Sequence, residues 1–463
     1  MKSTVLLCLC GCTFNFGVEG EVSKNVDSDV MDSGVTDSGD TDSGDTDSGD
    51  TDSGDTEPLY MLEIANISSD SLDRAGYAVG APIPGMFTMS SDGNDTVYGF
   101  ATDSTLYRDV SMPPDPADFT YSDTIGNISA GMGTFTVQAT GMMTEGFFCV
   151  GADYDSTYAP NGGKINCVRQ SKVMIGAGLN ESDSDVVFYG AMNNLYLGAE
   201  AFSADLNSDG KSDFIGGGGD PGTIVVEFGV WETVLAAPSG STLTYVFPAD
   251  ADLSFVACDT DDDGVSNSSS FCAPRTASMS SILVTDSYNT APAPIIETFA
   301  LPLVAGVAPT RINQRRMATP TVPVGTIGVW TSYGWIVNDP GNDQFLRYDE
   351  DLSGSSAITM PRYGTAWGLA TGVVDGAPWI AFGASDYSDN GMTVAANIGS
   401  RMIKDYMEAD YVNVPGEGDS NNGCGYSLTF ATTTDGEEAL VAGCYKAGSM
   451  VKGAKEYVFR PAP

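Results

Sequence analysis

The sequence predicts an all-β fold built from repeated units, and three observations support this. Glycine is frequent, at 55 of 463 residues, and together with abundant Thr, Val, Tyr and Phe it favours short strands joined by tight turns. No window has the period of a long amphipathic helix, and no run of 18 apolar residues occurs, so we expect no membrane-spanning helix. A pattern of strand, polar turn, strand and Gly-rich loop recurs along most of the chain.

The N-terminus is typical of an exported protein. In residues 1–11, Lys2 precedes a short apolar run, as in a secretory signal peptide. Leu9-Cys10-Gly11-Cys12 resembles a bacterial lipobox, which implies that Cys12 is lipidated. We therefore expect a lipoprotein of the outer membrane or cell surface that contacts membrane through its lipid only. The alternative is an ordinary signal peptide and a secreted protein.

Residues 12–57 predict a disordered acidic linker. The motif DSGDT occurs four times between residues 37 and 56, and residues 19–57 hold 14 acidic side chains against one Lys. The motif has no apolar side chain to bury, so folding could not offset its loss of chain entropy. We expect a solvated, self-repelling stalk.

From residue 58 to 463 we expect one repeated architecture. The clearest copies of the unit run over 132–168, 197–228, 367–395 and 426–459, and fainter copies over 85–101, 243–258 and 324–337. These make seven units of roughly 45–60 residues.

The unit at 197–228 resembles an FG-GAP repeat, the blade of integrin α-subunit-type β-propellers. Leu197-Gly198 stands in the Phe-Gly place and is followed by an apolar strand, an Asp-rich turn and a second apolar strand. The other six units keep strands and glycines but have lost most of the Asp-rich turn. The resemblance implies a seven-bladed β-propeller of four-stranded antiparallel blades over 58–463. The alternative is a pair of β-sandwiches.

Two acidic loops are candidate calcium sites, because Ca²⁺ takes six to eight hard oxygen ligands. In the first loop, alternating side chains can converge before Gly210. Lys211 would offer its carbonyl oxygen, and the carboxylate of Asp213 would complete the site. In the second, Asn stands in the closing position. The candidate ligands are Asp205, Asn207, Asp209, Lys211 and Asp213 in the first loop, and Asp259, Asp261, Asp263, Val265 and Asn267 in the second. The alternative in both places is an acidic turn without metal.

Six cysteines follow Cys12 and fall into three couples, each within a hairpin-sized segment. Local pairing then predicts the disulfides Cys149–Cys167, Cys258–Cys272 and Cys424–Cys444. Disulfides fit an exported chain. The alternative is six free buried thiols.

The net charge of −42 and the absence of His exclude several functions. Nucleic acid is a poor partner for so acidic a surface, and a Ser-His-Asp triad or His-ligated metal cannot form. The basic cluster Arg311, Arg315 and Arg316 could hold a carboxylate or sulfated glycan, or simply balance local charge. We expect a monomeric, non-enzymatic surface protein that binds a protein or glycan, or mediates adhesion. The alternatives are a polysaccharide hydrolase or lyase and a structural envelope component.

Overall fold

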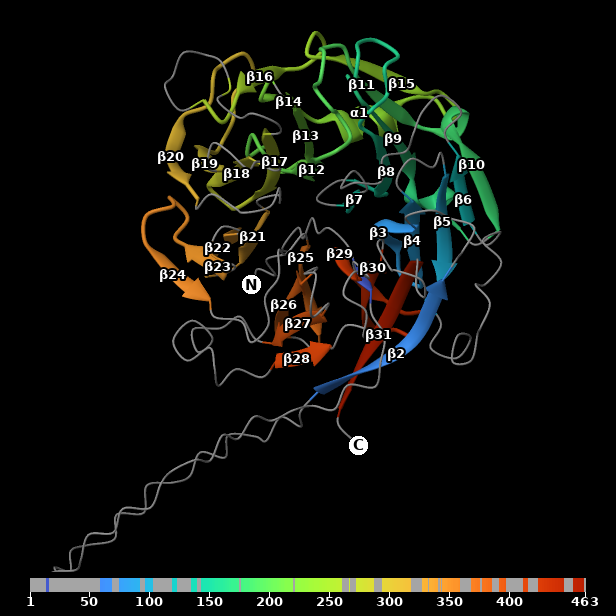
Figure 1. The fold of residues 1–463 in the computed structure, drawn as a ribbon. Coiled ribbons are helices and arrows are strands. Elements are labelled where there is room, and N and C mark those ends of the chain that lie inside the picture. The colour runs from blue at the N-terminus through green and yellow to red at the C-terminus, as the bar shows by residue number, and fades with distance from the viewer. Residues whose placement is uncertain are drawn as a thin grey trace, which may run out of the picture.

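The computed structural model describes residues 14–15, 59–68, 75–91, 96–102, 119–122, 135–139, 143–174, 176–219, 221–259, 266, 272–286, 294–317, 327–331, 333–339, 342, 344–358, 368–374, 377–384, 391–396, 411–414, 424–444 and 453–461. Within these residues the protein is mostly β, and its strands form seven small sheets that are largely antiparallel (Figure 1). The described part includes no helix long and apolar enough to cross a membrane.

We number the sheets 1 to 7. Sheet 1 joins the two ends of the chain and contains β2 (Leu59–Ser68), β29 (Cys424–Thr432), β30 (Glu438–Cys444) and β31 (Gly453–Pro461), with β1 (Phe14–Asn15) beside β30. Sheet 2 contains β3 (Ala75–Ile83), β4 (Met86–Ser91), β5 (Thr96–Ala101), β6 (Phe119–Ser122) and β10 (Ala177–Asn180). Sheet 3 contains β7 (Phe135–Val137), β8 (Phe147–Ala152), β9 (Lys164–Arg169), β11 (Val186–Gly190) and β15 (Leu243–Phe247).

The remaining sheets have four strands each. Sheet 4 contains β12 (Ala201–Ala204), β13 (Asp213–Gly218), β14 (Thr223–Glu227) and β16 (Leu253–Val256). Sheet 5 contains β17 (Cys272–Ala277), β18 (Ser281–Asp286), β19 (Ile295–Ala300) and β20 (Arg311–Arg316). Sheet 6 contains β21 (Gly328–Thr331), β22 (Gly334–Asp339), β23 (Gln344–Tyr348) and β24 (Ser355–Ile358). Sheet 7 contains β25 (Leu369–Val374), β26 (Ala377–Ala384), β27 (Gly391–Ala396) and β28 (Tyr411–Val414). The described helices are α1 (Val230–Ala236) and the 3-10 turns η2 (Gln170–Lys172) and η3 (Glu181–Asp183).

The sheets follow one another around a common centre (Figure 1). One strand of each sheet contacts one strand of the next, through β3, β7, β12, β17, β21, β25 and β29, and β29 contacts β3 again. In sheet 1, β2 pairs antiparallel with β31, so the N-terminal and C-terminal strands share one ladder.

The hydrophobic core lies between neighbouring sheets. Four consecutive residues of β14, Thr223 to Val226, are buried. Such a continuous buried run is expected where both faces of a sheet are covered. Between sheets 3 and 4, the ring of Phe188 stacks on that of Phe214 at 4.2 Å between centroids. Trp231 of α1 packs against Phe147, with 5.1 Å between the ring centroids, and so adds the helix to this core. Each sheet is therefore stabilised mainly by its neighbours.

Two expectations about the repeat are corrected by the strand pairing. Sheets 1, 2 and 3 have five strands, not four, because β1, β10 and β15 are added to them, the last two in parallel. The faint unit 243–258 is not a sheet: β15 joins sheet 3 and β16 joins sheet 4. A sheet we did not expect, sheet 5, occupies residues 272–316. The long connection 228–252 carries α1 and β15, and this insertion obscured the boundary between units.

Two of the three expected disulfides are confirmed, Cys149–Cys167 and Cys258–Cys272. The first joins opposite residues of β8 and β9. Cys424 and Cys444 are opposite in the β29–β30 ladder, but their side chains lie outside the described ones, so that disulfide stays a prediction. Cys12 and the repeats at 37–56 also lie outside the described residues.

Candidate functional site

The first predicted calcium loop, residues 205–213, connects β12 to β13 and is held by its own hydrogen bonds. One carboxylate oxygen of Asp205 accepts from the amide of Asp209 (3.1 Å) and the other from the amide of the residue after it (3.0 Å). Asn207 Oδ1 also accepts from the Asp209 amide (2.9 Å), and Asp209 Oδ1 accepts from the Lys211 amide (2.9 Å). These side chains therefore fix the turn whether or not metal is bound.

Asp213 has a different environment. It is fully buried, and its two oxygens accept hydrogen bonds from the amides of Leu206 and Gly229, both at 2.8 Å. Burial raises the pKa of Asp213 to about 7; the two amide bonds lower it and the carboxylates of Asp209 and Asp205 raise it further. Asp213 thus joins Leu206 of the loop to Gly229 in the connection that follows β14.

In this arrangement the loop does not present a ready metal site. Within the described ranges, no three Asp, Glu or Cys side chains converge as ligands. Calcium binding at 205–213 therefore stays a prediction. In the second loop Asp259 is described and buried, whereas Asp261, Asp263, Val265 and Asn267 lie outside the described residues.

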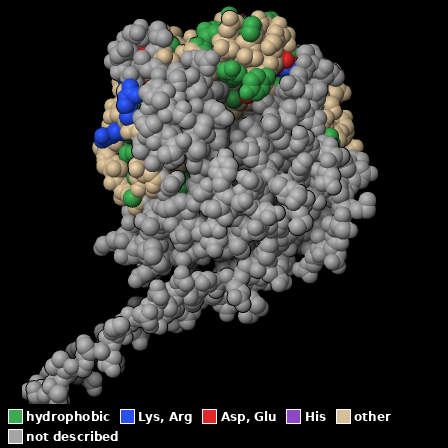
Figure 2. Space-filling model, viewed as in Figure 1, with side chains coloured by type: hydrophobic (Ala, Val, Ile, Leu, Met, Phe, Trp, Pro, Cys, Tyr) green, Lys and Arg blue, Asp and Glu red, His purple; other side chains and the backbone are tan. Residues whose placement is uncertain are grey.

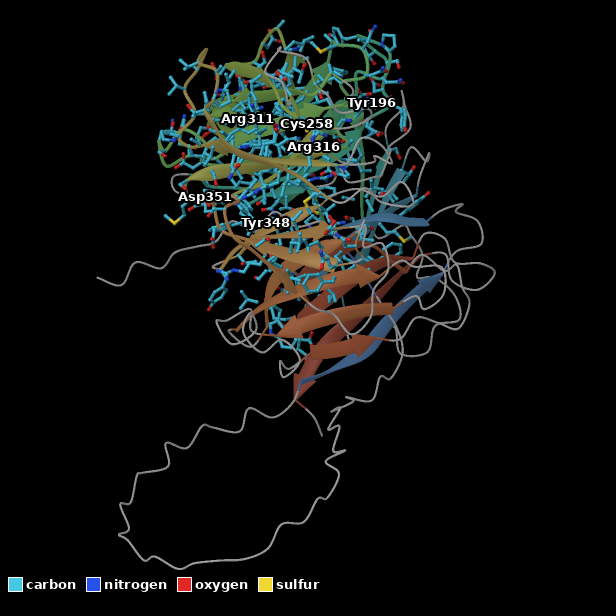
Figure 3. All side chains as sticks on the ribbon, turned by 60° about the vertical axis from the view of Figure 1, so that its left-hand side comes forward. Tyr196, Cys258, Arg311, Arg316, Tyr348 and Asp351 are labelled. Atoms are coloured by element: carbon cyan, nitrogen blue, oxygen red, sulfur yellow. A yellow bond between two sulfur atoms is a disulfide. The ribbon has the colours of Figure 1, made fainter. Side chains whose placement is uncertain are left out.

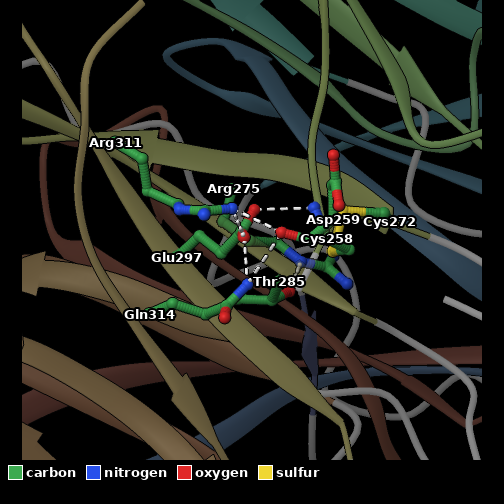
Figure 4. The surroundings of a disulfide bond; sticks show 8 residues. All are labelled: Cys258, Asp259, Cys272, Arg275, Thr285, Glu297, Arg311 and Gln314. Atoms are coloured by element: carbon green, nitrogen blue, oxygen red, sulfur yellow. Dashed lines mark hydrogen bonds and ion pairs between the residues drawn. A yellow bond between two sulfur atoms is a disulfide. The ribbon is translucent and has the colours of Figure 1, made fainter. Parts of the chain in front are cut away.

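A buried glutamate ties the start of this second loop to sheet 5 (Figure 4). Glu297 is fully buried and accepts from the Cys258 amide (2.6 Å), Gln314 Nε2 (2.5 Å) and Arg311 Nη1 (3.2 Å). Arg311 also donates to the Asp259 carbonyl. Burial raises the pKa of Glu297, and these hydrogen bonds and the charge of Arg311 act against that shift.

The basic cluster on β20 is therefore engaged within the fold. Arg311 bonds Glu297, and Arg315 Nε donates to the Leu352 carbonyl at 3.1 Å. Figure 2 shows Lys and Arg side chains on the side of the molecule where β20 lies, and Figure 3 shows Arg311 and Arg316 there as sticks. These contacts favour local charge balance over a dedicated anion site.

A surface that the sequence reasoning missed lies on the turn between β8 and β9, which we call the tyrosine loop (residues 153–163). Tyr154 and Tyr158 are each 53 % exposed. The ring of Tyr154 meets that of Tyr196 edge-on at 5.6 Å, and the ring of Tyr158 lies 4.9 Å from that of Tyr189. Each exposed ring therefore packs against a second tyrosine ring, which restricts its movement.

Near Tyr196, the ring partner of Tyr154, two Asn side chains lie on an unusual backbone. Asn161, Asn194 and Tyr196 all have positive φ, at 51°, 57° and 49°, which costs of order 1–3 kcal/mol at each non-Gly residue. Asn161 Nδ2 donates to Asn194 Oδ1 (3.0 Å), and the amide of Tyr196 donates to the carbonyl of Asn161 (3.0 Å). Backbone strain of this kind clusters at binding sites, so this surface is the strongest candidate site in the described part.

The sequence carried only a weak signal for it. Tyr154 and Tyr158 occur in a mostly polar stretch, residues 153–162, that ends in Asn161-Gly162, which indicates a turn. Composition cannot tell an exposed tyrosine from a buried one, because the partners Tyr189 and Tyr196 lie 31 and 42 residues further along the chain than Tyr158 and Tyr154.

A buried ion pair joins sheets 4 and 5. Glu200, just before β12, accepts from Arg275 of β17, whose Nε donates to Thr285 Oγ1 at 2.7 Å. Burial raises the pKa of Glu200 to about 7, and Arg275 lowers it. Since both partners are buried, this pair serves packing between the sheets.

No family model and no curated protein matches the chain. Among solved structures, BBS1N in complex with ARL6DN matches at 10 % identity and a TM-score of 0.40, covering 88 % of this chain and 96 % of that one. Prolyl oligopeptidase B from Galerina marginata matches at 10 % identity and a TM-score of 0.31, covering 83 % of this chain and 47 % of that one. At these TM-scores the likenesses carry no argument about activity or ligand.

Proposed function

We propose that the seven sheets are the blades of one closed β-propeller that carries a ligand-binding surface outside the cell. Support for closure comes from the cycle of contacts that runs through β3, β7, β12, β17, β21, β25 and β29 and from the ladder shared by β2 and β31. Such a ladder can fasten the last blade with strands from both chain ends.

The ligand we propose is a neutral glycan, and the observation that carries this is the pair of exposed, supported rings of Tyr154 and Tyr158. An aromatic face packs against the C–H face of a sugar ring, while neighbouring amides and hydroxyls bond its hydroxyl groups. The net charge of −42 repels anionic glycans. Amides and phenol hydroxyls such as those of this surface can both donate and accept hydrogen bonds with sugar hydroxyl groups.

An array of neutral glycans, probed with the full chain, tests this function. We expect binding that falls at least about tenfold in the double variant Tyr154→Ala, Tyr158→Ala. Met279→Ala is the matched control, since Met279 is 87 % exposed on the turn between β17 and β18. Equal binding by the double variant, or no binding to any neutral glycan, would refute the proposal. Turnover of a bound glycan would favour the hydrolase or lyase alternative.

Lipidation of Cys12 completes the proposal and would hold the monomeric domain at the membrane. Because Cys12 lies two residues before β1, which pairs with β30, the acidic stalk would separate the lipid from the domain only when β1 is released from β30. Calcium is proposed as a stabiliser of the 205–213 loop, supported by the spacing of Asp205, Asn207 and Asp209 and by the exposure of the loop. The remaining oxygens would come from the Lys211 carbonyl and water, since Asp213 bonds two backbone amides.

A further inference from the structure

Beneath the tyrosine loop, a fully buried lysine lies between two carboxylates. Lys164 is the first residue of β9, and its side chain is 0 % exposed. Its Nζ lies 3.7 Å from Asp155 Oδ2 and 3.2 Å from Glu181 Oε1, and these two side chains are 2 % and 16 % exposed. Tyr189 also donates to Glu181 Oε1, at 3.2 Å.

The two carboxylates differ in how they are held. Asp155 Oδ1 accepts from the Thr157 amide at 2.9 Å, whereas Asp155 Oδ2 is buried and has no hydrogen-bond partner. Glu181 Oε1 is hydrogen-bonded both to Lys164 Nζ and to Tyr189. Asp155 thus faces the amine with an unbonded oxygen, and Glu181 is positioned to exchange protons with the same amine.

We propose that Lys164 and Asp155 condense into an intramolecular isopeptide bond, with Glu181 as the proton carrier. Nζ attacks Cγ of Asp155; the N–C bond forms as the Cγ–Oδ2 bond breaks. The two protons that the ammonium loses leave with Oδ2 as water, one of them by way of the Glu181 carboxylate, which ends unchanged. The sum is ammonium plus carboxylate giving amide plus water, so no oxidant or cofactor is needed.

Burial and proximity favour this reaction over a lasting ion pair. Both side chains are buried, and burying two charges costs solvation free energy that a neutral amide does not lose. Holding the amine 3.7 Å from Asp155 Oδ2 replaces a bimolecular encounter by an intramolecular one, which lowers the barrier. The product would leave a neutral amide in place of two buried charges.

The bond would sit in the same hairpin as the disulfide Cys149–Cys167. Asp155 lies in the tyrosine loop and Lys164 at its end, so the amide would fix the base of the surface that carries Tyr154 and Tyr158. Formation of this bond does not depend on what that surface binds.

Peptide mapping of the full chain after disulfide reduction tests the proposal. Trypsin cleaves after free lysine, so an acylated Lys164 should leave the Lys164–Ile165 bond uncut, in a peptide from Asp109 to Arg169 that is lighter by one water. Chymotrypsin, which cleaves after Tyr158, should then give a branched peptide. Because an Asp residue can also lose water by forming a succinimide with its own backbone, loss of mass counts only if the branched peptide joins Asp155 to Lys164.

Variants and an internal control complete the test. Glu181→Gln keeps both reactants and should give unbranched peptide of full mass; Lys164→Arg should do the same. Lys172 is the internal control: its Nζ lies 2.9 Å from Asp185 Oδ2 but its side chain is 34 % exposed, and trypsin should cleave after it. Normal cleavage after Lys164 in the unaltered chain, or a bond to Glu181 in place of Asp155, would overturn the assignment.

Discussion

Replacing Phe188 by alanine should strongly destabilise the protein, because this residue joins two sheets. Phe188 of β11 is fully buried. Its ring stacks on Phe214 of sheet 4 at 4.2 Å and on Phe247 of β15 at 5.7 Å, and meets Trp231 of α1 edge-on at 6.0 Å. One side chain therefore contacts a sheet, an added strand and the helix.

The magnitude follows from that burial. Truncating a buried Phe to Ala costs about 3–5 kcal/mol, from lost transfer free energy and the cavity left behind. Stacked aromatic pairs add roughly 0.5–1.5 kcal/mol beyond area burial. We therefore expect Phe188→Ala and Phe214→Ala to be coupled by about that amount in a double-mutant cycle.

Guanidinium unfolding followed by tryptophan fluorescence measures both quantities, and Trp231 reports from within the cluster. Phe345 of sheet 6 is the matched control, since it is also buried but packs against Phe382. Phe188→Ala combined with Phe345→Ala should be additive within about 0.5 kcal/mol. A cost below about 1 kcal/mol for Phe188→Ala, with no coupling to Phe214, would refute packing between sheets as the source of stability.

Three further predictions concern charge, calcium and the second loop. Burial and the nearby carboxylates of Asp252 and Asp250 raise the pKa of Glu227 from 4.5 to about 7. The protonated Glu227 side chain therefore stabilises the folded chain below pH 4.5, and this contribution is lost as pH rises through about 7. Thermal melts of Glu227→Gln should show a weaker pH dependence than those of the unaltered chain. If calcium binds at 205–213, millimolar Ca²⁺ should raise the melting temperature by a few degrees over EDTA, and Asp209→Ala should reduce the shift; equal melting in both buffers would contradict the site. Glu297→Ala should destabilise the chain by about 1–3 kcal/mol, because it leaves the buried Cys258 amide without its acceptor. Restored stability in Glu297→Gln would show that the hydrogen bond, and not the charge of Glu297, provides this contribution.

The repeat was readable from the sequence because its causes are local. Short apolar runs broken by Asp-Gly or Gly-rich turns produced β12 to β14 and β25 to β27 where the unit predicts them. Close spacing likewise predicted Cys149–Cys167 and Cys258–Cys272. A period does not reveal insertions, however, so the sequence predicts residues 243–258 as one unit, although β15 and β16 within them belong to different sheets.

The candidate surface depends on contacts that no local pattern encodes. The exposed ring of Tyr154 packs against Tyr196, which lies in the connection from β11 to β12. Lys164 is buried beside Asp155 and Glu181 because β9 runs between β8 and β11. In a chain with 62 acidic residues, one carboxylate pair does not stand out by composition.

The most direct test of the proposed function compares Tyr158→Ala with Tyr158→Phe by calorimetric titration of a neutral glycan identified on the array. Stacking requires the ring, so the phenylalanine variant should keep Kd within about threefold of the unaltered chain, and the alanine variant should weaken binding at least about tenfold. Equal Kd values for the two variants would contradict a binding surface built on this ring.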